Sequence, residues 1–272
     1  MHIVISGSGQ GIGKAIALDL SLDKNIKKLT LISKSDNLKA ALNEIKNINK
    51  FIEVDTIIAD ISVKDDLKAI NRKLISQDIQ GLINCAGILG PSKYMEHLSL
   101  SDFEKVFSVN LFGMMELIKI VLPIFKKNHY GRIINFGGGG AAYGYPKFLP
   151  YALSKVSVVR FSETLAEELT MQGFSNIHIN TIAPGAVNTQ MLDEVIESGG
   201  IVKTTVDISE PVKLARFLIF ENDNNINGRF IHSRDNYQDK KLFEDNLNKK
   251  MICTNPDLIV DRGNVRELCA GS

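Results

Sequence analysis

Short apolar segments rich in β-branched residues alternate along this chain with longer segments of helical apolar spacing. Seven short segments predict strands: Ile3–Ser6, Leu29–Ser33, Glu53–Ile58, Gly81–Cys85, Arg132–Phe136, His178–Ile182 and Arg229–His232. Strands that alternate with helices form crossover units, in which helices cover both faces of a parallel sheet. The pattern therefore predicts an α/β protein with a doubly wound, mostly parallel sheet in three αβα layers.

Two helical segments have distinctive apolar patterns. The segment Ser101–Phe125 predicts one buried stripe with steps of three and four residues, which Asn110 interrupts. The stripe consists of Phe103, Phe107, Asn110, Met114, Leu117 and Val121. The segment Tyr151–Met171 has apolar residues on more than one side, so we expect it to pack against both the sheet and another subunit. A homodimer or homotetramer built on these two helices is predicted.

The length of 272 residues favours a single domain with one core. We assign residues 1–235 to this domain and residues 236–272 to a polar C-terminal extension with a short helix near Lys240–Asn248. The extension is interpreted as solvated, with a lid or a subunit contact as the alternative.

Charge and hydropathy argue against large charged partners. The 32 basic and 31 acidic residues leave a net charge of +1, so no overall field attracts nucleic acid or an anionic membrane. No apolar run approaches the roughly 20 residues of a membrane helix, and the chain enters a strand pattern at His2 without a basic, apolar leader. We expect a cytoplasmic protein with a small-molecule partner.

Cysteine and histidine positions give no indication of a disulfide framework or a metal site. Cys85, Cys253 and Cys269 contain no C-x-x-C pair, and the five histidines have no metal-ligand spacing. Reduced thiols and no bound metal are expected.

A glycine-rich loop follows the first predicted strand and leads directly into a helical pattern. Glycines there permit a tight turn and a close approach of the backbone, so the free N–H groups of the helix can face a pyrophosphate. The predicted cofactor contacts of this loop are Gly7, Ser8, Gln10, Gly11, Ile12 and Gly13.

The G-x-x-x-G-x-G spacing of Gly7, Gly11 and Gly13 resembles the short-chain dehydrogenase/reductase family, and further motifs follow in that family's order. These are Asp60-Ile61 after the third strand, Asn84-Cys85-Ala86-Gly87 after the fourth, Asn110, Tyr151-x-x-x-Lys155, and Pro184-Gly185-Ala186-Val187-Asn188-Thr189. The resemblance spans about Ile3 to Arg229.

The resemblance implies a single-domain Rossmann fold and an NAD(P)-dependent oxidoreductase that transfers hydride between the nicotinamide and a secondary alcohol or ketone. It implies further cofactor contacts at Asp60, Ile61, Asn84, Ala86, Gly87, Tyr151, Lys155, Pro184, Gly185, Val187 and Thr189. Asp60 and Thr189 are equally compatible with capping helices.

Tyr151 and Lys155 are the predicted centre of the chemistry. A tyrosine with a pKa near 10 is a poor base, so a nearby cation is needed to favour the phenolate, and Lys155 lies one helical turn away. In the family this lysine also holds the nicotinamide ribose, and the counterpart of Asn110 anchors a water for proton relay. An interfacial tyrosine with a solvated lysine, and an asparagine that merely bonds its helix, are the structural alternatives.

One position departs from the family pattern. The family has a substrate-binding serine thirteen residues before the tyrosine, and this chain has Gly138 there. We expect backbone N–H groups of the Gly137–Gly140 loop, or Tyr143, to replace the missing hydroxyl. The alternative is a catalytically impaired NAD(P)-binding sensor or scaffold. The segment Gly137–Tyr145 is similar to a family subgroup linked to sugar and surface-polysaccharide pathways, so a sugar or sugar-nucleotide substrate is one hypothesis.

The end of the second predicted strand bears on the choice of cofactor. An acidic residue there usually accepts the adenosine ribose hydroxyls, but this chain has Ser33, followed by Lys34 and Ser35. A serine and a lysine suit a 2′-phosphate, although a solvent-facing lysine also explains Lys34, and Gln10 is not basic. The sequence favours NADP over NAD.

Overall fold

A computed structural model describes residues 1–200, 202, 204–239 and 251–252, and it has a parallel sheet at its centre. The sheet has eight strands in the order β3-β2-β1-β4-β5-β6-β7-β8, and each neighbouring pair is parallel. The strands are β1 (His2–Ser6), β2 (Lys28–Ser33), β3 (Glu53–Ile58), β4 (Gly81–Asn84), β5 (Gly131–Phe136), β6 (Ile177–Ala183), β7 (Phe230–His232) and β8 (Met251–Ile252). The doubly wound fold and all seven predicted strands are confirmed, whereas β8 was not predicted.

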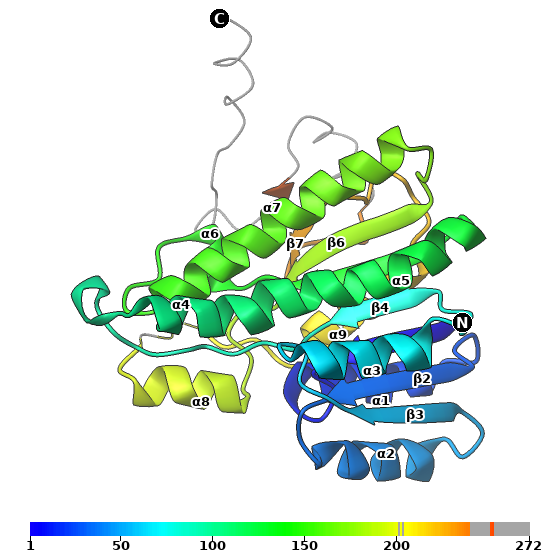
Figure 1. Ribbon diagram of the computed structural model, residues 1–272, viewed down its shortest axis with the longest axis horizontal. Coiled ribbons are helices and arrows are strands. Elements are labelled where there is room, and N and C mark those ends of the chain that lie inside the picture. The colour runs from blue at the N-terminus through cyan, green and yellow to red at the C-terminus, as the bar shows by residue number, and fades with distance from the viewer. Residues whose placement is uncertain (201, 203, 240–250, 253–272) are drawn as a thin grey trace, which may run out of the picture.

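Helices cover both faces of the sheet, as Figure 1 shows. They are α1 (Gly11–Ser21), α2 (Asn37–Ile48), α3 (Lys64–Leu74), η1 (Met95–His97), α4 (Leu100–Phe107), η2 (Ser108–Gly113), α5 (Met114–Asn128), α6 (Gly139–Ala142), α7 (Leu149–Met171), α8 (Gln190–Glu197) and α9 (Ser209–Phe220). Side chains of α1, α2 and α9 form one apolar core, and those of α3, α5 and α7 form the other. The predicted helix near Lys240–Asn248 lies outside the described residues.

The topology changes direction between β1 and β4. The chain runs outward from β1 through β2 to β3, then crosses back to place β4 on the other side of β1. In register, Ser6 pairs with Asn84, and Asn84 pairs with Asn135 on β5. The loops that follow these strands therefore leave the same edge of the sheet at a switch point, which is where ligands bind in open α/β sheets.

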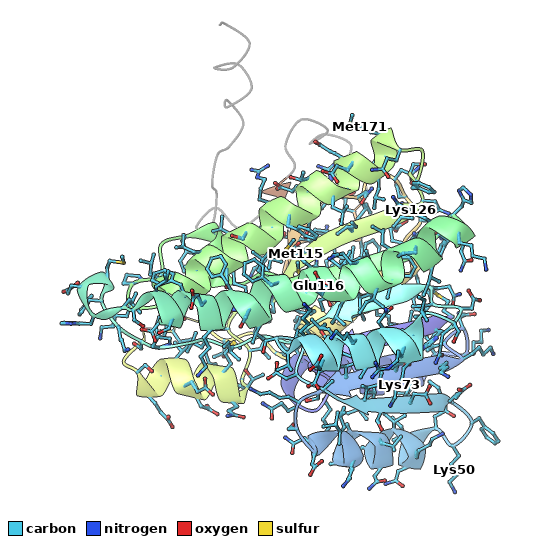
Figure 2. All side chains as sticks on the ribbon, viewed as in Figure 1. Lys50, Lys73, Met115, Glu116, Lys126 and Met171 are labelled. Carbon is cyan, nitrogen blue, oxygen red and sulfur yellow. The ribbon has the colours of Figure 1, made fainter. Side chains whose placement is uncertain are left out.

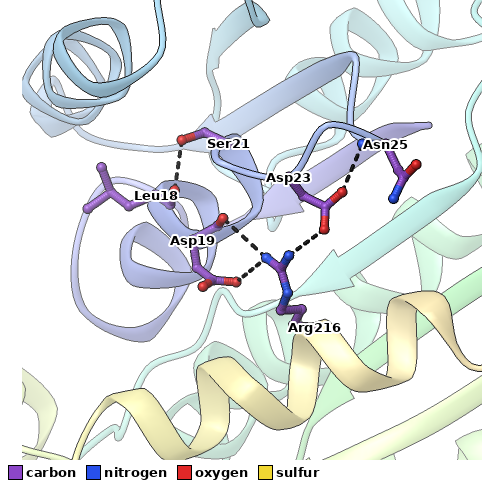
Figure 3. Close-up of polar contacts among 6 residues, drawn as sticks. All are labelled: Leu18, Asp19, Ser21, Asp23, Asn25 and Arg216. Atoms are coloured by element: carbon purple, nitrogen blue, oxygen red, sulfur yellow. Dashed lines mark hydrogen bonds and ion pairs between the residues drawn. The ribbon is translucent and has the colours of Figure 1, made fainter.

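An arginine on α9 joins two helices of one layer (Figure 3). Arg216 donates to the Asp19 carboxylate at 3.1 Å, and its other terminal nitrogen pairs with Asp23. Asp19 lies near the end of α1 and Asp23 just after it. This pairing fixes the end of the helix that begins at the glycine-rich loop. Figure 2 shows the side chains on these elements, with Lys50 at the lower edge of the molecule.

The predicted helix Ser101–Phe125 contains a turn of π-helix, which changes its buried stripe. Because η2 adds a residue to the turn that holds Asn110, the apolar position before it is Val106, which is fully buried. Phe103 and Phe107 are only partly buried, contrary to the sequence prediction. The remainder of the stripe, Asn110, Met114, Leu117 and Val121, is buried as predicted.

The continuous helical run Leu100–Asn128 is apolar enough to cross a membrane by length and composition alone, with a mean hydropathy of 1.6 over its most apolar window. No apolar run of this length was predicted from the sequence, and Glu116 and Lys119 lie within this one. These two side chains pair with each other at 2.7 Å on the exposed side of α5. Leu117 and Phe125 of the same helix lie in the core against the sheet, as the core helix of a doubly wound fold does.

Candidate active site

The glycine-rich loop packs closely against the loop that follows β4. A Cβ built on Gly7 would lie 2.6 Å from the backbone nitrogen of Ala86, and Gly7 has a φ of +68° that favours glycine. A Cβ on Gly13 would lie 2.4 Å from the Gly7 carbonyl oxygen. Only glycine fits at either position. The loop therefore brings the N-terminus of α1 to the switch point of the sheet, where its free N–H groups can bind a pyrophosphate.

The predicted P-G-x-V-x-T segment closes the other side of this loop. A Cβ on Gly11 would lie 3.5 Å from the Thr189 methyl carbon, and Val187 forms a β-bridge with Val206. Thr189 precedes the first turn of α8, and its hydroxyl donates to the Val187 carbonyl at 3.1 Å. Pro184 and Gly185 follow β6 directly. The structure thus brings the first and last of the predicted cofactor segments together.

The end of β2 lies beside the glycine-rich loop. A Cβ on Gly9 would lie 3.0 Å from the Ser33 hydroxyl, and the Gln10 amide accepts from Asn37 at 3.1 Å. Lys34 is exposed next to this loop. The Ser33–Ser35 turn offers two hydroxyls to a ligand, and Ser33 stands where an acidic residue would accept ribose hydroxyls.

Asp60 forms a turn with Ser62 and does not cap a helix, because the N-cap residue of α3 is Val63. Its carboxylate accepts from the Ser62 N–H at 2.9 Å and from the Ser62 hydroxyl at 2.6 Å. Partial burial opposes its ionisation, but these hydrogen bonds and the charge of Lys34 hold the pKa of Asp60 below its usual value. Ile61 beside it is buried, and its backbone oxygen would lie 2.6 Å from a Cβ on Gly113 in η2.

Tyr151, Lys155 and Asn110 meet at the carboxyl edge of β4 and β5. Pro150 lies in the first turn of α7, so Tyr151 and Lys155 project from the start of that helix. The Lys155 Nζ lies 5.6 Å from the centre of the Tyr151 ring and donates to the Phe136 carbonyl at 2.8 Å. A Cβ on Gly87 would lie 3.3 Å from Asn110 Oδ1 and 3.6 Å from Lys155 Nζ. All three side chains are buried.

Asn110 holds the loop after β4 to the helices. Its carbonyl accepts from the Ile88 N–H at 2.8 Å, and its amide donates to the Ile88 carbonyl at 2.9 Å and to the Ser154 hydroxyl at 3.0 Å. Both amide protons are therefore used, and one lone pair on Oδ1 remains for a water. The side chain can serve the proton relay as an acceptor only.

Burial dominates the ionisation of the central pair. It raises the pKa of Tyr151, and the neighbouring phenols of Tyr145 and Tyr143 add to this effect. It lowers the pKa of Lys155 to about 8. The expectation that Lys155 lowers the pKa of Tyr151 is not met in this arrangement, because the Lys155 ammonium is directed to the Phe136 carbonyl. Tyr151 is thus a neutral phenol at pH 7 and is suited to donate a proton.

Gly138 lies next to the Tyr151 hydroxyl. A Cβ at this position would be only 2.8 Å from the hydroxyl oxygen, so a side chain here would point at the reacting group. Tyr143, one predicted substitute for the missing serine, is 51% exposed and packs edge-on against Tyr145 at 6.3 Å. Within the described part of the chain, the hydrogen-bond partner of the Tyr151 hydroxyl is the Met191 sulfur at 3.9 Å. The Gly137 N–H donates to the Ile182 carbonyl at 2.9 Å, so the replacement for the missing serine stays a prediction between the other backbone N–H groups of the loop and Tyr143.

The sequence analysis missed a buried polar chain beneath the site. Asn84 donates to Asn135 at 2.9 Å, Asn135 donates to Ser162 at 2.9 Å, and Thr181 donates to the same serine at 2.9 Å. Asn84 Oδ1 is buried and has no hydrogen-bond partner among the described residues. A buried acceptor without a partner is costly, so a bound donor group would relieve it. This orphaned atom and the glycine-lined loop fit a nicotinamide dinucleotide.

These features together define a dinucleotide-dependent oxidoreductase with a tyrosine–lysine centre. The chain belongs to the short-chain dehydrogenase family, because the family model described as short chain dehydrogenase matches residues 1–199. It is an NAD(P)-dependent short-chain dehydrogenase/reductase. Within residues 1–200, 202, 204–239 and 251–252, no three His, Cys, Asp or Glu side chains gather as metal ligands.

Two curated relatives and one crystal structure illustrate the similarity. The chain is 31% identical to 3-oxoacyl-(acyl-carrier-protein) reductase FabG of Buchnera aphidicola over 244 residues, which cover 84% of this chain and 94% of the relative. It is 31% identical to levodione reductase of Leifsonia aquatica over 194 residues, which cover 70% and 71%. A crystal structure of levodione reductase superposes with a TM-score of 0.77 at 26% identity, covering 87% of this chain and 96% of that one.

Proposed function

We propose that this protein is an NADPH-dependent reductase that converts a ketone to a secondary alcohol. One observation carries the proposal: the phenol of Tyr151 is buried beside Lys155, at the edge of the sheet where the glycine-rich loop begins. Burial also raises the pKa of Tyr151, and a protonated phenol can give its proton to a carbonyl oxygen, as reduction requires.

The chain's own residues would manage the proton. When bound, the nicotinamide supplies hydride to the carbonyl carbon and is itself oxidised. Tyr151 donates its phenolic proton to the carbonyl oxygen, which completes the alcohol. Lys155, with a pKa lowered to about 8, would have to turn from the Phe136 carbonyl to favour the transient phenolate and to help return a proton. Asn110 would hold the relay water through its remaining lone pair.

The preference for NADPH rests on the end of β2. Ser33 and Ser35 provide hydroxyl groups, and the exposed Lys34 provides a cation for a 2′-phosphate. We expect the dissociation constant for NADPH to be at least tenfold lower than that for NADH. A Ser33→Asp variant should reverse this preference, because its carboxylate would repel the phosphate and accept the ribose hydroxyls. Calorimetric titration of both cofactors measures the preference. Tighter binding of NADH than of NADPH by the wild type would refute it.

Tyr151→Phe tests the catalytic assignment. The variant removes the proton donor and little volume, so NADPH-dependent ketone reduction should fall at least a thousandfold while NADPH still binds. Turnover is followed by the loss of nicotinamide absorbance with a panel of ketones, including sugars and sugar nucleotides. Near-normal activity in the variant would show that Tyr151 is not the acid. A wild type that binds NADPH but reduces no ketone would instead favour the sensor or scaffold alternative.

A homo-oligomer is also part of the proposal. Leu153 and Val156 on α7 are 44% and 37% exposed, and Phe112 in the π-helical turn η2 is 54% exposed. Apolar groups at these positions favour an interface between copies of the chain. We further propose that it works in the cytoplasm, where the free thiol of Cys85 stays reduced. A light-scattering mass of one chain, about 30 kDa, at working concentration would exclude the oligomer.

A further inference from the structure

Apolar and aromatic side chains from several segments pack around Tyr151. Leu89, Phe148 and Val195 are buried with Tyr151 in one cluster, and Tyr145, Met191 and Val202 pack against it. They come from three separate segments: the loop after β4, the loop before α7, and α8 with the loop that follows it. Three independent segments therefore present the same kind of surface to the reacting group.

Met191 holds the position that a substrate oxygen has to take. Its sulfur lies 3.9 Å from the Tyr151 hydroxyl, and a thioether is a weak acceptor. A carbonyl oxygen must approach the phenol to about 2.6–3.2 Å to receive its proton, so it must displace this sulfur. Methionine is flexible and unbranched, so it can move aside and repack along an apolar body. Its position in the first turn of α8 places the helix directly over the site.

The aromatic residues add a flat wall. Tyr145 stacks on Phe148 with ring centres 4.9 Å apart, and Tyr145 lies 6.3 Å from the Tyr151 ring. Gly138 leaves the space beside the Tyr151 hydroxyl without a polar side chain. A ligand rich in hydroxyl groups would lose its water against these side chains, whereas an apolar ring would bury its surface against them.

We propose that the substrate is a ketone carried on an apolar ring or alkyl body, and that Met191 is a specificity-determining residue for it. The inference rests on the proposed ketone reduction and adds the substrate class. It differs from the sugar hypothesis that the sequence suggested, because apolar side chains from three segments pack around Tyr151. The carbonyl faces Tyr151, and the apolar body replaces Met191 against Phe148 and Val195.

Two ketones with the same six-membered ring test the substrate class. An alkyl-substituted cyclohexanone should be reduced with a kcat/KM at least a hundredfold higher than that of pentahydroxycyclohexanone. Binding is measured separately by calorimetry on protein saturated with NADP+, where the alkylcyclohexanol should bind at least thirtyfold more tightly than inositol. Equal or better binding of the hydroxylated ligand overturns the inference. If neither ketone is reduced, the proposed function fails, and the binding measurement still decides the class of ligand.

Met191→Gln tests the residue, with Ile196→Gln as its matched control. Both changes put an amide on α8, but Ile196 is 54% exposed on the side away from Tyr151. Met191→Gln should lower kcat/KM for the alkylcyclohexanone and weaken binding of its alcohol at least tenfold, with NADPH binding unchanged. Ile196→Gln should leave all three values unchanged. Equal effects of the two variants would show that Met191 does not determine the substrate specificity of the site.

Discussion

At the scale of single residues, the glycine run before α7 is a packed element of the site. Gly137, Gly138 and Gly140 are buried, and a Cβ on them would lie 2.7 Å from Phe230, 2.8 Å from the Tyr151 hydroxyl and 2.7 Å from Ala152, respectively. Each glycine is required because a neighbour occupies the space that a side chain would take.

Gly138→Ala should lower turnover at least tenfold, about 1.4 kcal/mol in barrier. The added methyl group would press on the Tyr151 hydroxyl, which has to shift by several tenths of an ångström. Gly138→Ser brings the same Cβ but also a hydroxyl donor, so it should recover part of the loss. Gly144→Ala in the same loop is the control, because a Cβ there meets no atom within 4 Å. All are measured as kcat with saturating NADPH.

Two outcomes would change this interpretation. An unchanged kcat in Gly138→Ala would mean that the position of the Tyr151 hydroxyl does not limit turnover. A Gly138→Ser variant more active than the wild type would mean that the family serine was lost without replacement. The sensor or scaffold alternative would then gain support.

At the scale of elements, the sequence predicted what depends on local pattern and missed what depends on packing. The seven strands of the main sheet were found because their β-rich segments are bounded by turns, and Tyr151 and Lys155 were paired because both lie on one helix. The π-turn at Asn110 was missed, since a single inserted residue is invisible to a count of 3.6-residue steps. Met191 was missed as well, because the contact between α8 and Tyr151 is purely tertiary.

The π-turn has a clear consequence for the site. Within it, Asn110 accepts from the Ile88 N–H and Gly113 packs against the Ile61 backbone. The same element therefore fixes both the loop after β4 and the segment after β3 that flanks the cofactor loop.

At the scale of the whole molecule, catalytic and stabilising groups lie at opposite edges of the sheet. The cofactor loop, Tyr151 and Lys155 follow the carboxyl ends of the strands, whereas His2 and His178 lie near the amino ends of β1 and β6. His2 is 6% exposed and bonds Thr30 at 2.8 Å, and His178 is 1% exposed and bonds Asn224 at 2.9 Å. The burial of these histidines could not be predicted, because a lone histidine in a strand pattern does not reveal which groups surround it.

These two histidines should make the fold sensitive to mild acid. Burial, reinforced by the charge of Lys28 at His2 and of Arg132 at His178, lowers the pKa of each to about 4. The unfolded chain binds these protons near pH 6.5, so their contribution to stability is present above that pH and is lost as the pH falls towards 4. Each contributes at most about 3 kcal/mol. The free energy of unfolding, from urea titrations at pH 7 and pH 4.5, should fall less in a His2→Gln, His178→Gln double variant than in the wild type. His97 is exposed, so the His97→Gln variant is the control, and its free energy of unfolding should fall as much as that of the wild type. An equal fall in all three proteins would assign the acid sensitivity to other groups.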